Sequence, residues 1–234
     1  MTRLALAFLL LAVPVLAAEA PYLTPEQVDL MHLLPPPPPP GSVRQAEELA
    51  FMHGLESTRS TARVAQAQSD VDESVRTMFG AILGADFDPG GVPPDPGGVP
   101  LTMALFRRLA ATEEAVVQPA KAGFHRARPY IADPTLNPVL SRPTNDSYPS
   151  GHTSRSTVMG IVLARMVPER SAAIFARMLD YSESRVIGGV HFPSDLVAGR
   201  QAGTAIDAVL FTDPAFLADF APARAELRRA LGLP

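Results

Sequence analysis

The sequence predicts an all-α fold, a compact helical bundle with no substantial sheet. Hydrophobic residues make up 47% of the 234-residue chain, which is enough to form a sizeable core. Beyond the proline-rich N-terminal region, apolar residues and capping signals recur at helical spacing. The sequence has no convincing run of alternating apolar and polar residues, the pattern of a half-buried strand. We therefore expect helices packed around a shared core.

The first twenty residues have the layout of a secretory signal peptide. Arg3 supplies a positive charge, and residues 4–16 form an apolar run too short to span a bilayer. Small residues follow at Ala17 and Ala18. We expect residues 1–17 to be removed on export, leaving a periplasmic protein that does not associate with the membrane. An uncleaved membrane anchor is the alternative.

Residues 18–41 are predicted to form an extended, proline-rich N-terminal segment. Within it Thr24 and Gln27 fit a helix capping box. The segment ends in LPPPPPPG (34–41), which favours polyproline II and which we interpret as a stiff spacer or strap. Docking of a proline-binding partner is the less favoured interpretation.

Residues 42–234 are predicted to form a single helical domain. Ser42 and Gln45 fit a second capping box, and residues 42–82 have the pattern of one or two amphipathic helices. A loop follows at 88–100, where Asp-Pro-Gly-Gly-Val-Pro occurs twice; its glycines and prolines exclude a helix.

A long helix is predicted at about 101–124. Its apolar stripe consists of Leu101, Leu105, Leu109 and Val116. Thr112 interrupts this stripe, and Pro119 is expected to kink or break the helix near its end. After a connection rich in Pro, Asn, Asp and Ser at 129–148, four more helices are predicted. They cover about 151–166, 169–187, 193–211 and 213–231.

The net charge of −4 excludes a general binder of nucleic acid or of anionic membranes. Any site for an anion must therefore be a local cluster of cations. The first such cluster is KAGFHRARP (121–129), where a continuing helix would place Lys121 and Arg128 on one face. Pro129 disfavours helix at Arg128, so we expect two cations at a helix end. Alone, such cations usually only complement the helix dipole.

A second candidate stretch is Pro149-Ser150-Gly151-His152, directly before a predicted apolar helix. Unpaired amides at a helix start bind anions, Gly151 lets a ligand approach the backbone, and Ser150 adds a hydroxyl donor. Alone, the stretch is more often a helix cap with a surface histidine.

A third candidate stretch is SRVIGGVHFPSD (184–195), in which His191 and Asp195 are four residues apart. On a helix start, the carboxylate can accept a hydrogen bond from one ring nitrogen and leave the other free, as a nucleophile or metal ligand needs. Arg185 adds a cation, and a surface ion pair is the alternative. Together, the three stretches match the charge and shape of a phosphate, whose transfer is catalysed mainly by positioning and electrostatics.

Together these stretches resemble a known signature. It reads Lys121-x6-Arg128-Pro129, Pro149-Ser150-Gly151-His152 and Ser184-Arg185-x5-His191-x3-Asp195. This is the signature of the type 2 phosphatidic acid phosphatase superfamily. From about Tyr22 onward the chain is most similar to the soluble bacterial class A non-specific acid phosphatases, with which it shares SYPSGHT (147–153) in full.

The resemblance implies an all-helical acid phosphatase of broad specificity that hydrolyses small phosphate monoesters without a metal ion or other cofactor. It implies that His191, oriented by Asp195, becomes phosphorylated and that His152 acts as general acid and base. The residues implied to hold the phosphate are Lys121, Arg128, Ser150, Gly151 and Arg185. A homo-oligomer is also suggested.

Other functions fit the same motifs. A vanadium-dependent haloperoxidase shares the signature, but those chains are usually longer and many use tryptophan, which is absent here. A membrane lipid phosphate phosphatase would need several spanning helices. A phosphate-binding module would not need the two histidines. A phosphohistidine could also transfer its phosphoryl group to alcohols or nucleosides.

Overall fold

The computed structural model describes residues 20–84 and 98–234, and regular structure within these ranges is entirely helical. The predicted all-α fold is confirmed. The predicted signal peptide (1–17) and most of the predicted Gly/Pro-rich loop (88–100) lie outside the described residues. None of the described helices has an apolar stretch long enough to cross a bilayer.

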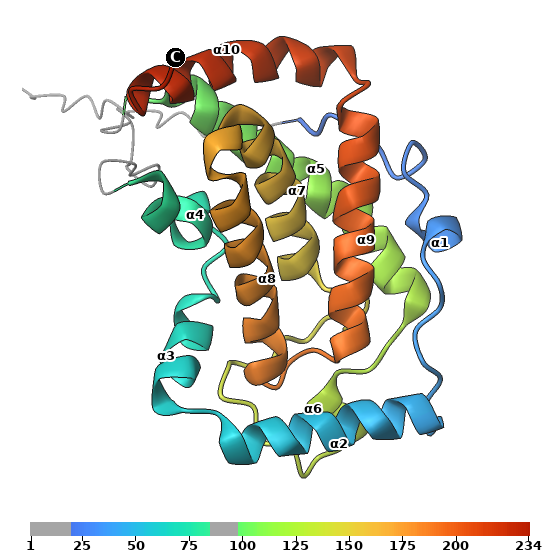
Figure 1. Cartoon of the computed structure of the whole chain (residues 1–234). Helices are drawn as coiled ribbons and strands as arrows, with labels where there is room; N and C mark the ends of the chain where they lie inside the picture. The colour runs from blue at the N-terminus through green and yellow to red at the C-terminus, as the bar shows by residue number, and fades with distance from the viewer. Residues whose placement is uncertain (1–19, 85–97) are drawn as a thin grey trace, which may run out of the picture.

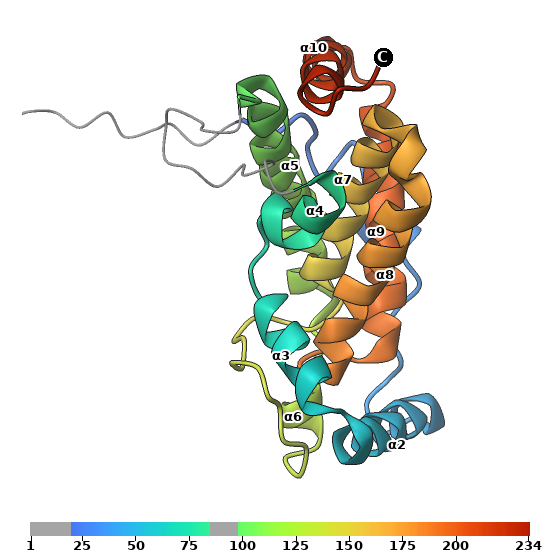
Figure 2. The same cartoon turned by 60° about the vertical axis from the view of Figure 1, so that its left-hand side comes forward.

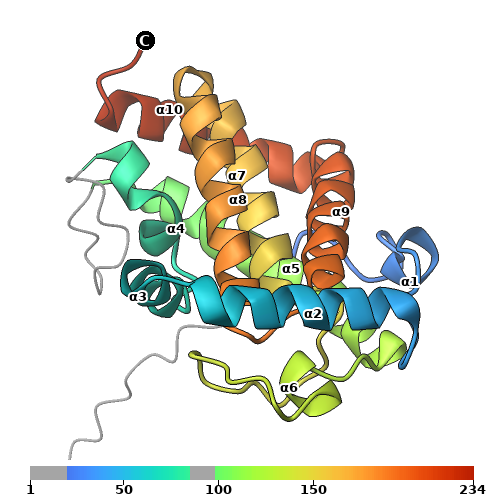
Figure 3. The ribbon, with the colours of Figure 1, turned by 60° about the horizontal axis from the view of Figure 1, so that its bottom comes forward.

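Four long helices form the central bundle (Figures 1 and 2). They are α5 (Pro100–Phe124), α7 (Gly151–Met166), α8 (Ser171–Ile187) and α9 (Pro193–Leu210). Helix α10 (Pro214–Ala230) crosses one end of the bundle and α2 (Val43–Thr58) crosses the other, as Figure 3 shows for α2. The last turns of α5 and α8 and the first turns of α7 and α9 meet at the α2 end.

Helix α7 is the most enclosed element, and two glycines of α9 bring the two helices together. A Cβ atom at Gly199 would lie 2.7 Å from the Ser150 carbonyl oxygen, and one at Gly203 would lie 2.7 Å from the Ser154 carbonyl oxygen. Both distances are below van der Waals contact, so only glycine permits this approach. The start of α7 is therefore held against the first turns of α9.

The N-terminal segment packs along the bundle as a strap. Its buried side chains are Tyr22, Leu23, Val28, Leu30 and Leu34, which join the main core. The Tyr22 amide donates a hydrogen bond of 2.9 Å to Thr112 Oγ1. Thr112, the polar residue that interrupts the apolar stripe of α5, thus forms a hydrogen bond with the strap. The strap contains one short helix, α1 (Leu30–Leu33), capped by Asp29.

The predicted capping boxes form only in part. The Ser42 hydroxyl accepts from the Gln45 amide, but the Gln45 side chain accepts from Gly41 instead of Ser42. The box at Thr24 and Gln27 was expected to start a helix and instead closes a turn. The region 42–82 contains three helices rather than one or two: α2 is followed by α3 (Thr61–Ser69) and α4 (Val75–Leu83).

Helix α5 continues through Pro119 and ends at Phe124, because His125 adopts a left-handed conformation with φ of 52°. Arg128 therefore does not continue α5; it is the N-cap of a short helix, α6 (Pro129–Ala132). The predicted end of the long helix at about residue 124 is confirmed, and Lys121 and Arg128 do not share one continuing helix. A short helix η1 (Pro168–Arg170) precedes α8. The ends of the last four predicted helices agree with those of α7, α8, α9 and α10 within two residues.

Candidate active site

A cavity of about 180 Å³ opens where α5 and α8 end and α7 begins. Six of the eight predicted site residues line it: Lys121, Arg128, Gly151, His152, Arg185 and His191. The other two, Asp195 and Ser150, are fully buried beside it. The fold thus brings the three separated stretches into one place.

His191 lies just before α9 and is held at both ring nitrogens. Its Nδ1 is 3.1 Å from Asp195 Oδ2, and its Nε2 is 2.8 Å from Arg128 Nη1. A guanidinium can only donate, so Nε2 is the acceptor and the ring proton is on Nδ1, facing the carboxylate. Burial and the charges of Arg128, Lys121 and Arg185 lower the pKa of His191 well below its usual range. The ring is therefore a neutral base with its Nε2 lone pair turned toward cations.

Asp195 is held by a buried network that the sequence did not reveal. Its Oδ1 accepts from Arg126 Nη1 at 2.6 Å, and its Oδ2 accepts from Ser147 Oγ at 2.5 Å and from the Phe192 amide at 2.9 Å. Arg126 Nη2 in turn donates to Glu48 Oε2 of α2 at 2.8 Å. The carboxylate that orients His191 is thus itself fixed by side chains from two other segments.

The three predicted cations surround the cavity. Arg185, in the last turn of α8, is 3% exposed, and its Nε and Nη1 have no hydrogen-bond partner among the residues that the structure describes. Burial lowers its pKa to about 10, so it stays charged. Burial and the neighbouring Arg128 lower the pKa of Lys121 to about 8. A buried guanidinium with free donors fits an incoming anion.

Arg128 is oriented by the loop before α7. It donates from Nε to the Asn145 carbonyl at 2.9 Å and from Nη2 to Asn145 Oδ1 at 2.7 Å. Its Nη1 also donates to the Val190 carbonyl at 2.8 Å. Lys121 Nζ donates to the carbonyl of the adjacent Asp146 at 3.0 Å. This loop was predicted only as a connection, yet it sets the position of two cations.

At the start of α7, Ser150 is the N-cap, and its hydroxyl accepts from the Thr153 amide at 3.3 Å. The side chain is fully buried and does not line the cavity, so its predicted contact with phosphate stays a prediction. A Cβ on Gly151 would lie 3.7 Å from Lys121 Cε, and so would occupy the space beside this cation. The first amides of α7 have no partner within the helix and carry the positive end of its dipole.

His152 is the second histidine of the cavity. Its Nδ1 is 2.6 Å from Glu73 Oε1, and its Nε2 is 3.2 Å from the Val71 carbonyl oxygen. Burial lowers the pKa of His152. The hydrogen bond to Glu73 raises this pKa, and the positive charge of Arg185 lowers it further.

Acidic residues also line the cavity. Burial raises the pKa of Glu113 to about 7, against the charge of Arg155 and a hydrogen bond from Ser154. Among the described residues no three His, Asp or Glu side chains are grouped so that they could hold one metal ion.

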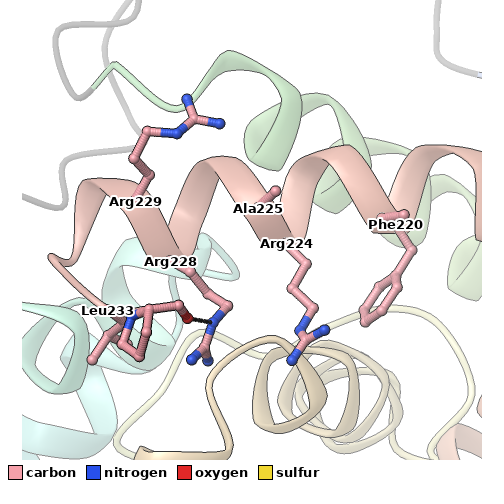
Figure 4. A pocket seen from close by; sticks show the side chains of 8 residues that line it. Phe220, Arg224, Ala225, Arg228, Arg229 and Leu233 are labelled. Atoms are coloured by element: carbon pink, nitrogen blue, oxygen red, sulfur yellow. Dashed lines mark hydrogen bonds between the residues drawn. The ribbon is translucent and has the colours of Figure 1, made fainter.

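A larger hollow of about 550 Å³ lies along α10 (Figure 4). There Arg228 Nε donates to the Pro234 carbonyl at 2.7 Å. This hollow contains none of the predicted site residues.

The chain is similar to proteins of known family. The model of the PAP2 superfamily matches residues 102–217, which include all eight predicted site residues. The non-specific acid phosphatase of Salmonella typhimurium is 31% identical over 221 residues, which cover 88% of this chain and 84% of that protein. That of Providencia stuartii is 29% identical, over 87% of this chain and 83% of the relative.

A solved structure shows the same fold. It is the transmembrane PAP2 type phosphatidylglycerolphosphate phosphatase from Bacillus subtilis. The TM-score is 0.52 and the sequences are 17% identical; the match covers 79% of this chain and 90% of that chain. With these relatives and the assembled signature, the chain belongs to the PAP2 superfamily and, within it, to the bacterial non-specific acid phosphatases.

Proposed function

We propose that this acid phosphatase hydrolyses phosphate monoesters of broad structure in two steps, through a phosphohistidine on His191 and without a metal ion. Its relatives carry the name of acid phosphatases. The observation that carries the mechanism is the neutral His191 ring, whose unprotonated Nε2 faces the cations of a cavity. Export to the periplasm and assembly into a homo-oligomer are also proposed, from the sequence and the resemblance.

In the first step the Nε2 lone pair of His191 attacks phosphorus, and the bond from phosphorus to the ester oxygen breaks. His152 gives its proton to the departing oxygen, which leaves as an alcohol. The phosphorylated ring of His191 becomes cationic, and Asp195, bonded to Nδ1–H, stabilises that charge. Arg128 Nη1, which donates to Nε2 in the free enzyme, is released to bind a phosphoryl oxygen.

In the second step His152 takes a proton from water as the water attacks phosphorus. The bond between phosphorus and Nε2 breaks, and its electron pair returns to the ring of His191. Lys121, Arg128 and Arg185 hold the equatorial oxygens in both steps, with the amides at the start of α7. Such fixed donors stabilise charge as it develops and need no reorganisation.

Activity toward p-nitrophenyl phosphate is expected to survive EDTA unchanged, because protein cations supply the charge that a metal ion would otherwise supply. The measurement is the steady-state release of phosphate by the purified protein before and after dialysis against the chelator. Activity that disappears with EDTA and returns with a divalent cation would overturn the metal-independent mechanism. No phosphate release under any condition would overturn the phosphatase itself.

The rate is expected to be highest on the acidic side and to fall as the pH rises. His152 must be protonated to act as the acid, and burial lowers its pKa from the ordinary histidine value. As the pH rises, Glu113 gains negative charge with a pKa of about 7 and Lys121 loses positive charge with a pKa of about 8. All three changes weaken turnover or phosphate binding, whereas His191 remains a neutral nucleophile. A profile of kcat/KM that is still flat above pH 8 would contradict this assignment.

A further inference from the structure

Glu73 belongs to none of the three signature stretches, yet it lines the cavity. It lies between α3 and α4, in a loop that approaches the start of α7. Its Oε1 is 2.6 Å from His152 Nδ1, and its Oε2 accepts from Arg155. Burial raises the pKa of Glu73, but the hydrogen bond from His152 and the charges of His152, Arg155 and Arg185 outweigh this and hold the pKa at about 2. The carboxylate is therefore ionised whenever the enzyme works.

The same loop binds both nitrogens of the His152 ring. The Val71 carbonyl oxygen, 3.2 Å from Nε2, can only accept a hydrogen bond, so Nε2 carries a proton. The ionised Glu73 also only accepts, so a proton is held at Nδ1 as well. A ring that donates from both nitrogens is an imidazolium, which is the form that a general acid needs, so these two contacts favour the protonated ring against the effect of burial. The proton on Nε2 is hydrogen-bonded to the Val71 carbonyl, whereas the proton on Nδ1 faces Glu73, which lines the cavity.

The remaining groups around the ring do not favour its positive charge. Arg185 of α8 repels it, and burial disfavours it. Tyr181 of α8 stacks on the ring, with centroids 6.0 Å apart, and burial raises the pKa of this tyrosine, so it stays neutral. Arg155 is bound to Glu73, Glu113 and Glu114. Glu73 is thus the described carboxylate that contacts the ring directly.

We propose that Glu73 is a positioning residue for His152. Its carboxylate favours the protonated ring and holds the transferable proton on Nδ1 at the cavity. This inference rests on the proposed role of His152 as general acid. The leaving oxygen takes the Nδ1 proton as its bond to phosphorus breaks, and the ring becomes neutral while Nε2–H stays on Val71. Arg155 retains the carboxylate in place, so that Nδ1 can recover a proton from the attacking water.

The test compares Glu73→Gln with the parent on two phosphate esters whose leaving groups differ in basicity. An alkyl ester needs a general acid, whereas a dinitrophenyl ester leaves without protonation. General acid catalysis contributes about 10²–10⁴-fold, so kcat/KM for the alkyl ester is expected to fall by about 10²-fold. The rate for the dinitrophenyl ester is expected to change little. The falling limb of the pH profile is also expected to move to lower pH, because the ring loses its stabilising charge.

Glu114→Gln is the matched control. Glu114 also binds Arg155, with Oε2 3.0 Å from Nη2, whereas the described hydrogen bonds of the His152 ring go to Glu73 and Val71. Its replacement is expected to affect the two esters equally. An equal loss on both esters in Glu73→Gln would mean a merely structural role and would overturn the inference. His152→Ala separates the two proposals. If His152→Ala also loses equal activity on the alkyl and dinitrophenyl esters, the proposed role of His152 as general acid fails. If His152→Ala loses activity mainly on the alkyl ester but Glu73→Gln does not, only the role of Glu73 fails.

Discussion

Replacing His191 with alanine is expected to abolish turnover and covalent labelling together. The imidazole Nε2 is the proposed nucleophile, and no other described side chain of the cavity is placed as a neutral base among Lys121, Arg128 and Arg185. Removing a catalytic nucleophile lowers kcat by several orders of magnitude, so a loss of at least about 10³-fold is expected. Rapid quenching with phosphorus-labelled substrate should trap label on the parent protein and none on His191→Ala.

His125→Ala is the control for this experiment. His125 lies in the first motif, but its side chain is 77% exposed and it does not line the cavity. Its replacement is expected to leave both turnover and labelling at the parent level. Labelling that persists in His191→Ala at the parent level would place the intermediate on another residue and would contradict the mechanism.

Replacing Arg126 with methionine is expected to cause the largest loss of stability. The guanidinium bridges two buried carboxylates, with Nη1 2.6 Å from Asp195 Oδ1 and Nη2 2.8 Å from Glu48 Oε2. Methionine preserves much of the apolar volume but leaves two buried charges unpaired. Breaking a buried ion pair on one side costs about 3–5 kcal/mol. The free energy of unfolding, from urea denaturation, should fall by that amount, and the loss of a fixed Asp195 should also lower kcat.

Arg44→Met provides the surface comparison. The Arg44 side chain is 67% exposed and pairs with Glu47 at 3.5 Å, a kind of ion pair that contributes about 0–1 kcal/mol. If Arg126→Met cannot be purified, Glu48→Gln removes the negative charge from one of the same two ion pairs and can be measured in its place. Parent-like denaturation midpoints for both buried variants would show that the network does not stabilise the fold.

The sequence predicts the central helices well because apolar spacing in α5, α8 and α9 reflects their burial on one side. It predicts the site residues because they cluster in short local motifs. It does not predict Glu48 or Glu73, since each reaches the site through tertiary docking of a segment far from the motifs. The end of α5 at Phe124 agrees with the prediction, but nothing in the local pattern indicates that His125, a non-glycine residue, ends the helix with a positive φ. Arg126 lies within the first motif, but no local pattern marks it as the partner of two buried carboxylates.

Gly199 and Gly203 let α9 approach α7 so closely that a Cβ atom at either position would meet both a carbonyl oxygen and a threonine side chain of α7, Thr153 or Thr157. A contact of this kind loses no rotamer entropy on folding, whereas ordering a leucine there would cost about 0.5–1 kcal/mol. On the α9 side, the contact also contains no side-chain torsion angle that could relax when a neighbour changes. His152 lies in the first turn of α7 and His191 just before α9, so the close approach at these two glycines helps to fix the spacing between the proposed acid and nucleophile.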